Sequence, residues 1–168
     1  MIDFDSAIRA DYQKDYPFLS SFLGKVSPAD VDEDGRTLVM HAILASNVDI
    51  EMVRFLIEHG VPVNASDGNQ QWTALHFAAR DKRSRFVELL LSSGAEVDAV
   101  DIHGNTALGR SLDSLPHDPL TIEILVKAGA DPARRNRYGK SPLDVARLMA
   151  NPDLEAMLLQ STGRSGCA

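Results

Sequence analysis

Apolar residues between positions 73 and 98 recur at the three- and four-residue spacing of an α-helix rather than at alternate positions. One apolar face carries Leu75, Ala78 and Ala79, and a charged turn separates it from a second, leucine-rich face over residues 86–91. The second face is followed by Gly94, as expected for the end of a helix. The pattern therefore predicts two short helices, neither of which can bury its apolar face without a neighbouring unit.

The same arrangement recurs along the chain. Equivalent Thr or Ser residues open each unit with spacings of 36, 33 and 35 residues, at Thr37, Thr73, Thr106 and Ser141. We therefore predict one domain over residues 1–163, a flexible tail over 164–168, and four repeats over residues 31–64, 65–98, 99–132 and 133–163. Residues 1–30 are expected to form a helical cap, because a terminal unit has one face in water and must be atypical. Short paired helices at this period predict an all-α stacked solenoid.

The second repeat resembles an ankyrin repeat, whose pattern is Gly-x-Thr-Pro-Leu-His-x-Ala-Ala and then Leu-Leu-x-x-Gly-Ala. Its matching runs are Thr73 to Ala79 and Leu90 to Ala95, while the other repeats depart from the pattern at the His position, with Met40, Gly109 and Asp144. The resemblance implies an ankyrin-type helix-turn-helix solenoid of about four repeats plus the cap. It also implies that the His76 imidazole is hydrogen-bonded to the backbone between neighbouring repeats.

Composition narrows the class of protein. The 168 residues are 44% hydrophobic, enough for one core, with no apolar run near the roughly 18 residues that span a membrane. No signal peptide is evident, and the single cysteine, Cys167, is consistent with a reducing compartment, so we expect a cytoplasmic protein without a membrane partner. The net charge of −7 argues against nucleic-acid binding, which depends on basic residues.

Charge is distributed unevenly along the chain. Residues 1–64 carry 5 basic and 11 acidic side chains, residues 65–133 carry 6 and 10, and residues 134–168 carry 6 and 3. These sums are −6, −4 and +3, so we expect one acidic and one mildly basic end of the solenoid.

Catalytic and metal-binding patterns are missing from the sequence. The five histidines, His41, His59, His76, His103 and His117, have no spacing typical of metal ligands, and Gly-x-Ser-x-Gly does not occur. We therefore predict no metal, no cofactor and no enzymatic activity. The rival interpretation is an enzyme or small-molecule binder with its site in the loop of His117 and Pro119.

Protein binding suits this architecture better, because stacked repeats align equivalent loop tips and first helices into one extended surface. The expected tips are residues 32–36, 64–72, 100–105 and 134–138. The candidate contact residues on tips and first helices are Trp72, Ile102, His103, Tyr138, Arg137, Arg135, Phe77, Arg80, Arg110, Asp34 and Arg36. Two roles are open for Trp72: an interface anchor, or an indole folded back over the hairpin to cover apolar surface.

The sequence thus predicts a module that binds one protein partner and is monomeric when free. It could act as an inhibitor or immunity-type protein that masks an enzyme, or as an adaptor. The acidic first half favours masking of a basic surface. A self-associating structural protein is the alternative, and it predicts a dimer without any partner.

Overall fold

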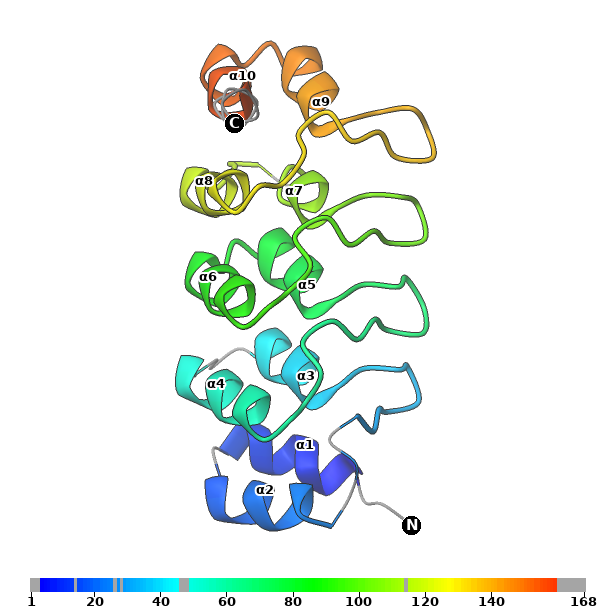
Figure 1. The fold of residues 1–168 in the computed structure, drawn as a ribbon, viewed down its shortest axis with the longest axis vertical. Helices are drawn as coiled ribbons and strands as arrows, with labels where there is room; N and C mark the ends of the chain where they lie inside the picture. Colours follow the sequence, from blue (N-terminus) through cyan, green and yellow to red (C-terminus); the bar gives the residue numbers. More distant parts are fainter. Residues whose placement is uncertain are drawn as a thin grey trace, which may run out of the picture.

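The computed structural model describes residues 4–159 except 14, 26, 28, 46–48 and 114, so the predicted tail and Cys167 lie outside the described residues. These residues contain ten helices, which pack as successive pairs stacked along one axis (Figure 1). The helices are α1 (Phe4–Gln13), α2 (Tyr16–Leu23), α3 (Leu38–Leu44), α4 (Ile50–Glu58), α5 (Ala74–Arg80), α6 (Ser84–Ser92), α7 (Ala107–Arg110), α8 (Pro119–Lys127), α9 (Pro142–Leu148) and α10 (Pro152–Leu159). The predicted all-α solenoid is confirmed.

The residues that define the sequence period are the N-caps of the first helices. The side chains of Thr37, Thr106 and Ser141 accept the backbone N–H groups of the residues three positions later, at 3.4, 3.3 and 3.1 Å. A hydroxyl at this position pairs one of the N–H groups that have no partner inside the helix. Each repeat therefore begins at a buried Thr or Ser for a local reason.

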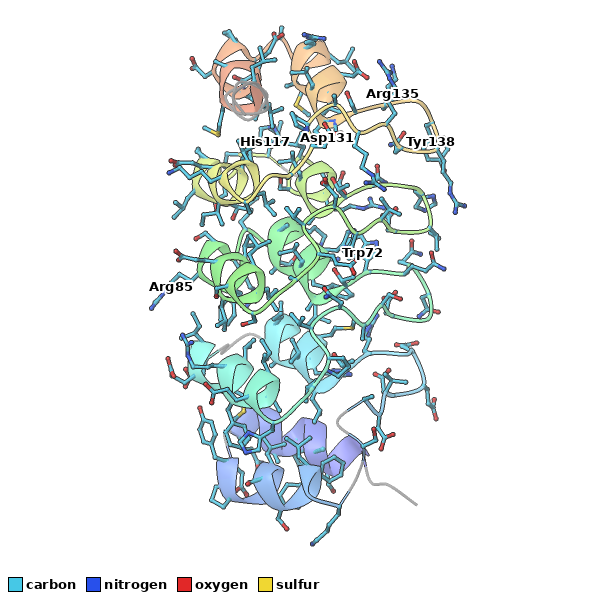
Figure 2. All side chains as sticks on the ribbon, viewed as in Figure 1. Trp72, Arg85, His117, Asp131, Arg135 and Tyr138 are labelled. Atoms are coloured by element: carbon cyan, nitrogen blue, oxygen red, sulfur yellow. The ribbon has the colours of Figure 1, made fainter. Side chains whose placement is uncertain are left out.

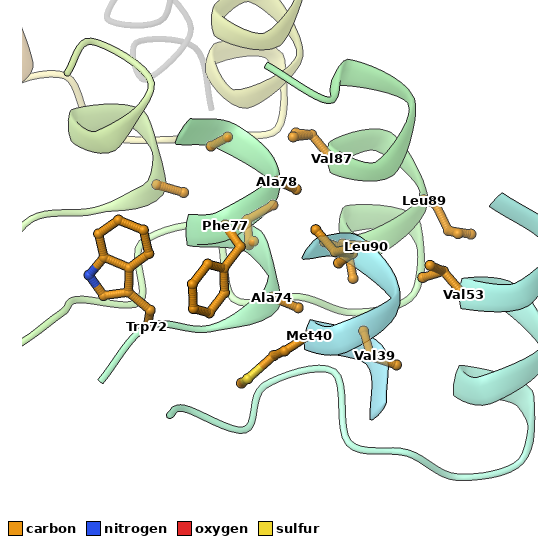
Figure 3. Close-up of a cluster of buried hydrophobic side chains, with 14 of the residues drawn as sticks. Val39, Met40, Val53, Trp72, Ala74, Phe77, Ala78, Val87, Leu89 and Leu90 are labelled. Atoms are coloured by element: carbon orange, nitrogen blue, oxygen red, sulfur yellow. The ribbon is translucent and has the colours of Figure 1, made fainter. Parts of the chain in front are cut away.

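The core is a continuous column between successive helix pairs. The first helices α3, α5 and α7 contact one another in order, as do the second helices α4, α6, α8 and α10. Figure 3 shows the junction of the first two repeats, where Met40 lies beside Phe77 and Leu90 fills the space between the helices. Because full burial of such a side chain stabilises the fold by about 1.5–3 kcal/mol, each repeat depends on its neighbours.

The N-terminal segment forms a helix pair of its own. Helix α2 is capped by Asp15, whose side chain accepts the backbone N–H of Phe18 at 3.1 Å, and it buries Leu19 and Leu23. Helix α1 packs on α2 and on α3. This pair lies where the sequence placed the cap.

The links between paired helices differ in length. Residues 81–83 join α5 to α6, whereas residues 111–118 join α7 to α8. Part of this difference arises because α7 has four residues and α5 has seven. The longest helix in the described part of the chain has 10 residues, and no described helix is long and apolar enough to cross a bilayer.

Candidate functional site

Four loop tips project on the side of the first helices (Figure 1). At the base of each tip, one Asp or Asn oxygen accepts two backbone N–H groups from its own loop. Asp101 Oδ1 accepts those of His103 and Asn105 at 2.8 and 2.9 Å, and Asn136 Oδ1 accepts those of Tyr138 and Lys140 at 2.9 and 3.0 Å. Asp32 Oδ1 accepts those of Asp34 and Arg36 in the first tip, and Asp67 Oδ1 accepts those of Gln70 and Trp72 in the second. This side chain therefore fixes the shape of every tip.

Sequence reasoning did not assign this role in shaping the loops to any of the four residues. The signal was present, because an Asp or Asn stands five residues before Thr37, Thr106 and Ser141 and six before Thr73. The extra residue in the second tip is accommodated at Gln71, which has a positive φ of 56°.

Backbone hydrogen bonds hold the tips together. The N–H groups of Gly68, Ile102 and Arg137 donate to the carbonyls of Asp34, Gln70 and His103 in the preceding tip, at 2.8, 3.0 and 2.9 Å. Each of the last three tips is thereby tied to the one before it. The tip side chains consequently lie in a fixed register along the solenoid.

Glycine makes this close approach possible at two positions. A Cβ on Gly35, where φ is +75°, would lie 2.5 Å from the backbone nitrogen of Gly68. A Cβ on Gly104, where φ is +78°, would lie 3.0 Å from the nitrogen of Arg137. Any larger residue would both strain the loop and separate the tips.

Trp72 lies at the base of the second tip, against the first helices (Figures 2 and 3). Its side chain is 7% exposed, and its ring centroid is 5.1 Å from that of Phe77, which is 5% exposed. The guanidinium carbons of Arg80 and Arg110 each lie 4.9 Å from the Trp72 ring. Of the two roles open to Trp72, this packing is that of an indole that covers apolar surface, with arginines as the outer layer.

Both arginines are held in ion pairs. Arg80 Nε lies 2.7 Å from Asp81, and Arg110 contacts both Asp101 and Asp113. Burial by itself would raise the pKa of Asp101, but the backbone N–H of Asn105 and the Arg110 guanidinium outweigh it, so the pKa is lowered. Asp101 thus links the third tip to the arginine that covers Trp72.

The His76 imidazole joins two repeats as the resemblance implied. Its Nδ1 accepts the backbone N–H of Thr73 at 3.1 Å, and its Nε2 lies 3.1 Å from the carbonyl oxygen of Asn105. These partners assign the proton to Nε2. Burial lowers the pKa of His76 more than the bond to Asn105 raises it, so the ring is neutral at pH 7.

The fourth tip carries candidate partner-contact residues that are exposed to solvent. Tyr138 is 70% exposed, and its hydroxyl lies 3.1 Å from Nδ1 of His103 in the third tip, where Ile102 is half-buried. Arg137 is exposed, and Arg135 donates to Asp144 at 2.9 Å (Figure 2).

The first tip lies at the other end of the row. Asp34 and Arg36 are paired there at 3.2 Å, and the Arg36 guanidinium lies 6.0 Å from the Phe77 ring. The structure thus places the candidates in three groups, namely the acidic first tip, the floor around Trp72, and the third and fourth tips.

The histidines are dispersed. His41 pairs with Asp32 at 2.8 Å, His59 lies 2.8 Å from the carbonyl oxygen of Phe55, and His117 Nε2 lies 3.3 Å from the sulfur of Met149. Within the described ranges, no three His, Cys, Asp or Glu residues lie close enough together to hold a metal ion.

The fold and the row of tips define a helical-repeat protein with an extended loop surface. Residues 7–101, more than half of the chain, match the family described as ankyrin repeats (3 copies). The chain therefore belongs to the ankyrin repeat family. Ankyrin repeats are generally protein–protein interaction modules and typically not enzymes.

Individual relatives share the repeats over part of their length. The chain is 33% identical over 142 residues to a transient receptor potential cation channel subfamily A member 1 homolog of Caenorhabditis elegans, which is 84% of this chain and 11% of that protein. It is 36% identical over 95 residues to the human ankyrin repeat and SOCS box protein 6, covering 54% of this chain and 22% of that protein. Identity to the BRCA1-associated RING domain protein 1 of C. elegans is 40% over 74 residues, covering 44% of this chain and 10% of that protein. The chain thus spans a small part of these relatives.

Proposed function

We propose that the chain binds one protein partner across its loop tips and first helices. The observation that supports this best is the backbone hydrogen bonding between successive tips. A surface held in one arrangement before binding loses little conformational entropy in the complex.

The contact residues fall into the three groups described above. Tyr138 is the proposed anchor, because tyrosine is enriched among residues that dominate binding energy and this one is largely exposed. His103, Ile102, Arg135 and Arg137 surround it, and Asp34 and Arg36 contact the partner at the first tip. Trp72, Phe77, Arg80 and Arg110 form the floor that holds these tips in place.

Charge sets the orientation of the partner. The first tip carries Asp30, Asp32, Glu33 and Asp34, and the last carries Arg134, Arg135 and Arg137. Opposite charges on the partner would raise the association rate more than the affinity, and salt would reduce that effect. The acidic end favours a partner with a basic surface that this chain masks as an inhibitor or immunity-type protein, and an adaptor role is the alternative.

Affinity capture from a native lysate with the full chain, followed by calorimetry on the purified pair, tests this proposal. The double variant Tyr138→Ala, Arg137→Glu should weaken binding at least about tenfold, the loss of one hot spot. The control is Arg85→Glu, an exposed arginine on α6 away from the tips (Figure 2), which should bind like the wild type. If the double variant folds and binds the partner as tightly as the wild type does, the proposed contact surface is wrong.

Light scattering on the free protein measures its oligomeric state and so distinguishes binding to a different protein from self-association. A monomer across a hundredfold range of concentration agrees with hetero-binding. A concentration-dependent dimer would contradict it, and loss of a measured partner activity in the complex would identify masking.

A further inference from the structure

The residue three positions after each helix-opening Thr or Ser differs in every repeat. Met40, His76, Gly109 and Asp144 occupy these positions in order. His76 spans the junction to the next repeat through its bond to Asn105. Gly109 has no side chain with which to do the same at the next junction.

A pocket of about 250 Å³ lies at that junction, between α7, α9 and the third and fourth tips. Thr106, Gly109 and Leu112 line it from one repeat, and Pro142 and Val145 from the next. A Cβ on Gly109 would find its nearest neighbour at 3.6 Å, an ordinary contact. The missing side chain is therefore a departure from the repeat pattern that leaves open space, and it is not imposed by crowding.

A residue that lines the same pocket has a backbone carbonyl that can accept one more hydrogen bond. Lys140 lines the pocket and stands one residue before Ser141, as Asn105 stands before Thr106. The carbonyl of Asn105 accepts two hydrogen bonds, from His76 and from the backbone of Asp101. Among the hydrogen bonds of the described residues, the Lys140 carbonyl accepts one, from the backbone of Asn136 at 2.8 Å. A donor that enters the pocket can take the place that an imidazole would occupy.

Several other polar groups that line the pocket are already paired. Asn136 Nδ2 donates to Asn105 Oδ1 at 2.7 Å, and the hydroxyls of Thr106 and Ser141 accept backbone N–H groups of α7 and α9. Leu112, Pro142 and Val145 supply an apolar part of the wall. The pocket therefore suits an apolar ring that carries one N–H donor.

Its volume favours a side chain over a free cofactor. A cavity of about 150 Å³ can hold benzene, whereas pockets for drug-sized ligands begin at roughly 300 Å³. An indole falls between these limits. A single tryptophan side chain is thus the occupant that fits both the size and the donor.

Two basic residues line the pocket. They are Arg134 and Lys140, and neither forms an ion pair with another described residue. Asp113 also lines the pocket, but it is paired with Arg110 at 2.9 Å. Carboxylates on either side of the entering ring would meet two unpaired cations.

We propose that this pocket binds a tryptophan side chain of the partner, flanked by acidic residues, with the indole N–H donating to the Lys140 carbonyl. This inference rests on the proposed function and specifies which partner segment meets the third and fourth tips.

The test uses the full chain and a synthetic peptide with one tryptophan between two pairs of glutamates. In ¹⁵N–¹H spectra, the peptide should shift the amides of Gly109, Ser141 and Val145 saturably. Gly109→His, which fills the pocket, should weaken binding at least about tenfold, the effect of losing one buried anchor. Leu148→His is the matched control, because Leu148 is 81% exposed and lies outside the pocket. Val145→Phe fills the pocket from its other wall if Gly109→His does not fold.

Two further peptides test the chemistry of the occupant. Replacing tryptophan with alanine should abolish the shifts, and replacing the glutamates with lysines should weaken binding at low salt. Free indole that binds as tightly as the acidic peptide would overturn the assignment to a protein segment. If the acidic peptide causes no saturable amide shift in the wild-type protein, the proposal that this pocket binds tryptophan is wrong.

Capture of the native partner distinguishes a failure of this pocket assignment from a failure of the proposed binding function. Capture that is lost in the Tyr138/Arg137 variant but equal in Gly109→His and wild type would overturn the pocket and leave the binding surface standing. Because Tyr138 also lines the pocket, loss in both variants, with Leu148→His unaffected, would support the pocket as part of the binding surface.

Discussion

The guanidinium carbon of Arg110 lies 4.9 Å from the ring of Trp72, although the two residues belong to different repeats. Asp101 holds that arginine from the base of the third tip. The indole, the arginine and the tip therefore form one unit, and the floor of the surface is coupled to its edge. A cation over an indole contributes about 0.5–2 kcal/mol, depending on its exposure to water.

Substitution of Trp72 should act on stability. Trp72→Ala should lower the free energy of unfolding by about 3–5 kcal/mol, as expected for a buried aromatic residue. Trp72→Phe should cost less, because it keeps a ring and removes a buried indole Nε1 that has no hydrogen-bond partner among the described residues. Urea unfolding followed by circular dichroism measures both. The exposed Leu148→Ala is the control and should change stability by no more than about 0.5 kcal/mol.

Helix pairs and their order could be predicted from the sequence because their determinants are local. Thr73 as an N-cap, the spacing of Leu75 and Ala79, and Gly94 at the end of α6 all act within a single repeat. The role of His76 followed from the family pattern. The same pattern of helix starts and ends occurs in four repeats, so the four occurrences together support a prediction that one alone would not.

The position of Trp72 could not be settled in the same way. Whether its indole projects or packs depends on Arg80 in its own repeat and on Arg110 one repeat later, and local spacing does not show that contact. The pocket beside Gly109 was equally hidden, because a missing side chain does not reveal whether a neighbour fills the space. Tertiary contacts between repeats decide both cases.

Stability should depend on pH through His76. Its folded-state pKa is lowered from 6.5, so the unfolded chain takes up the proton first. The contribution of neutral His76 is complete above pH 6.5 and is lost as the pH falls below that value. Between pH 7.5 and 5.5 the free energy of unfolding should fall through this residue by up to about 1.4 kcal/mol.

Urea unfolding of wild type and His76→Gln at both pH values isolates this effect. The variant should be less stable at pH 7.5 and should show a smaller decrease on acidification. The same decrease in both proteins would show that other groups account for the pH dependence.

Contact between the first two tips should depend on Gly35. Gly35→Ala forces a methyl group to within 2.5 Å of the Gly68 nitrogen and strains a positive φ. Gly139→Ala strains a similar φ of +72°, but its Cβ would have no neighbour within 4 Å. The second variant therefore carries the conformational cost alone, about 1–2 kcal/mol.

The difference between these two glycine variants measures the steric part. We expect Gly35→Ala to unfold at lower urea concentration and to speed amide exchange at Gly68, whose hydrogen bond to Asp34 it breaks. Equal stability of the two variants would contradict a close-packed row of tips.

The third tip should be sensitive to the charge of Asp101. Asp101→Asn keeps an oxygen for the backbone N–H groups of His103 and Asn105, as Asn136 does in the fourth tip, but it removes the charge paired with Arg110. The loss should be about 1–3 kcal/mol, because the partly buried Arg110 loses one of its two carboxylate partners and keeps only Asp113. Asp101→Ala removes both functions and should cost more, about 3–5 kcal/mol.

Acid should remove the difference between wild type and Asp101→Asn. The pKa of Asp101 is lowered from 3.8, so its charged form stabilises the fold above pH 3.8, and this contribution is lost as the pH falls through the folded-state value. Urea unfolding at pH 7 should therefore show the full gap between the two proteins, and the gap should shrink progressively below pH 3.8. A gap that stays constant down to pH 2 would assign the effect of the substitution to packing, whereas a shrinking gap identifies the ion pair with Arg110 as its source.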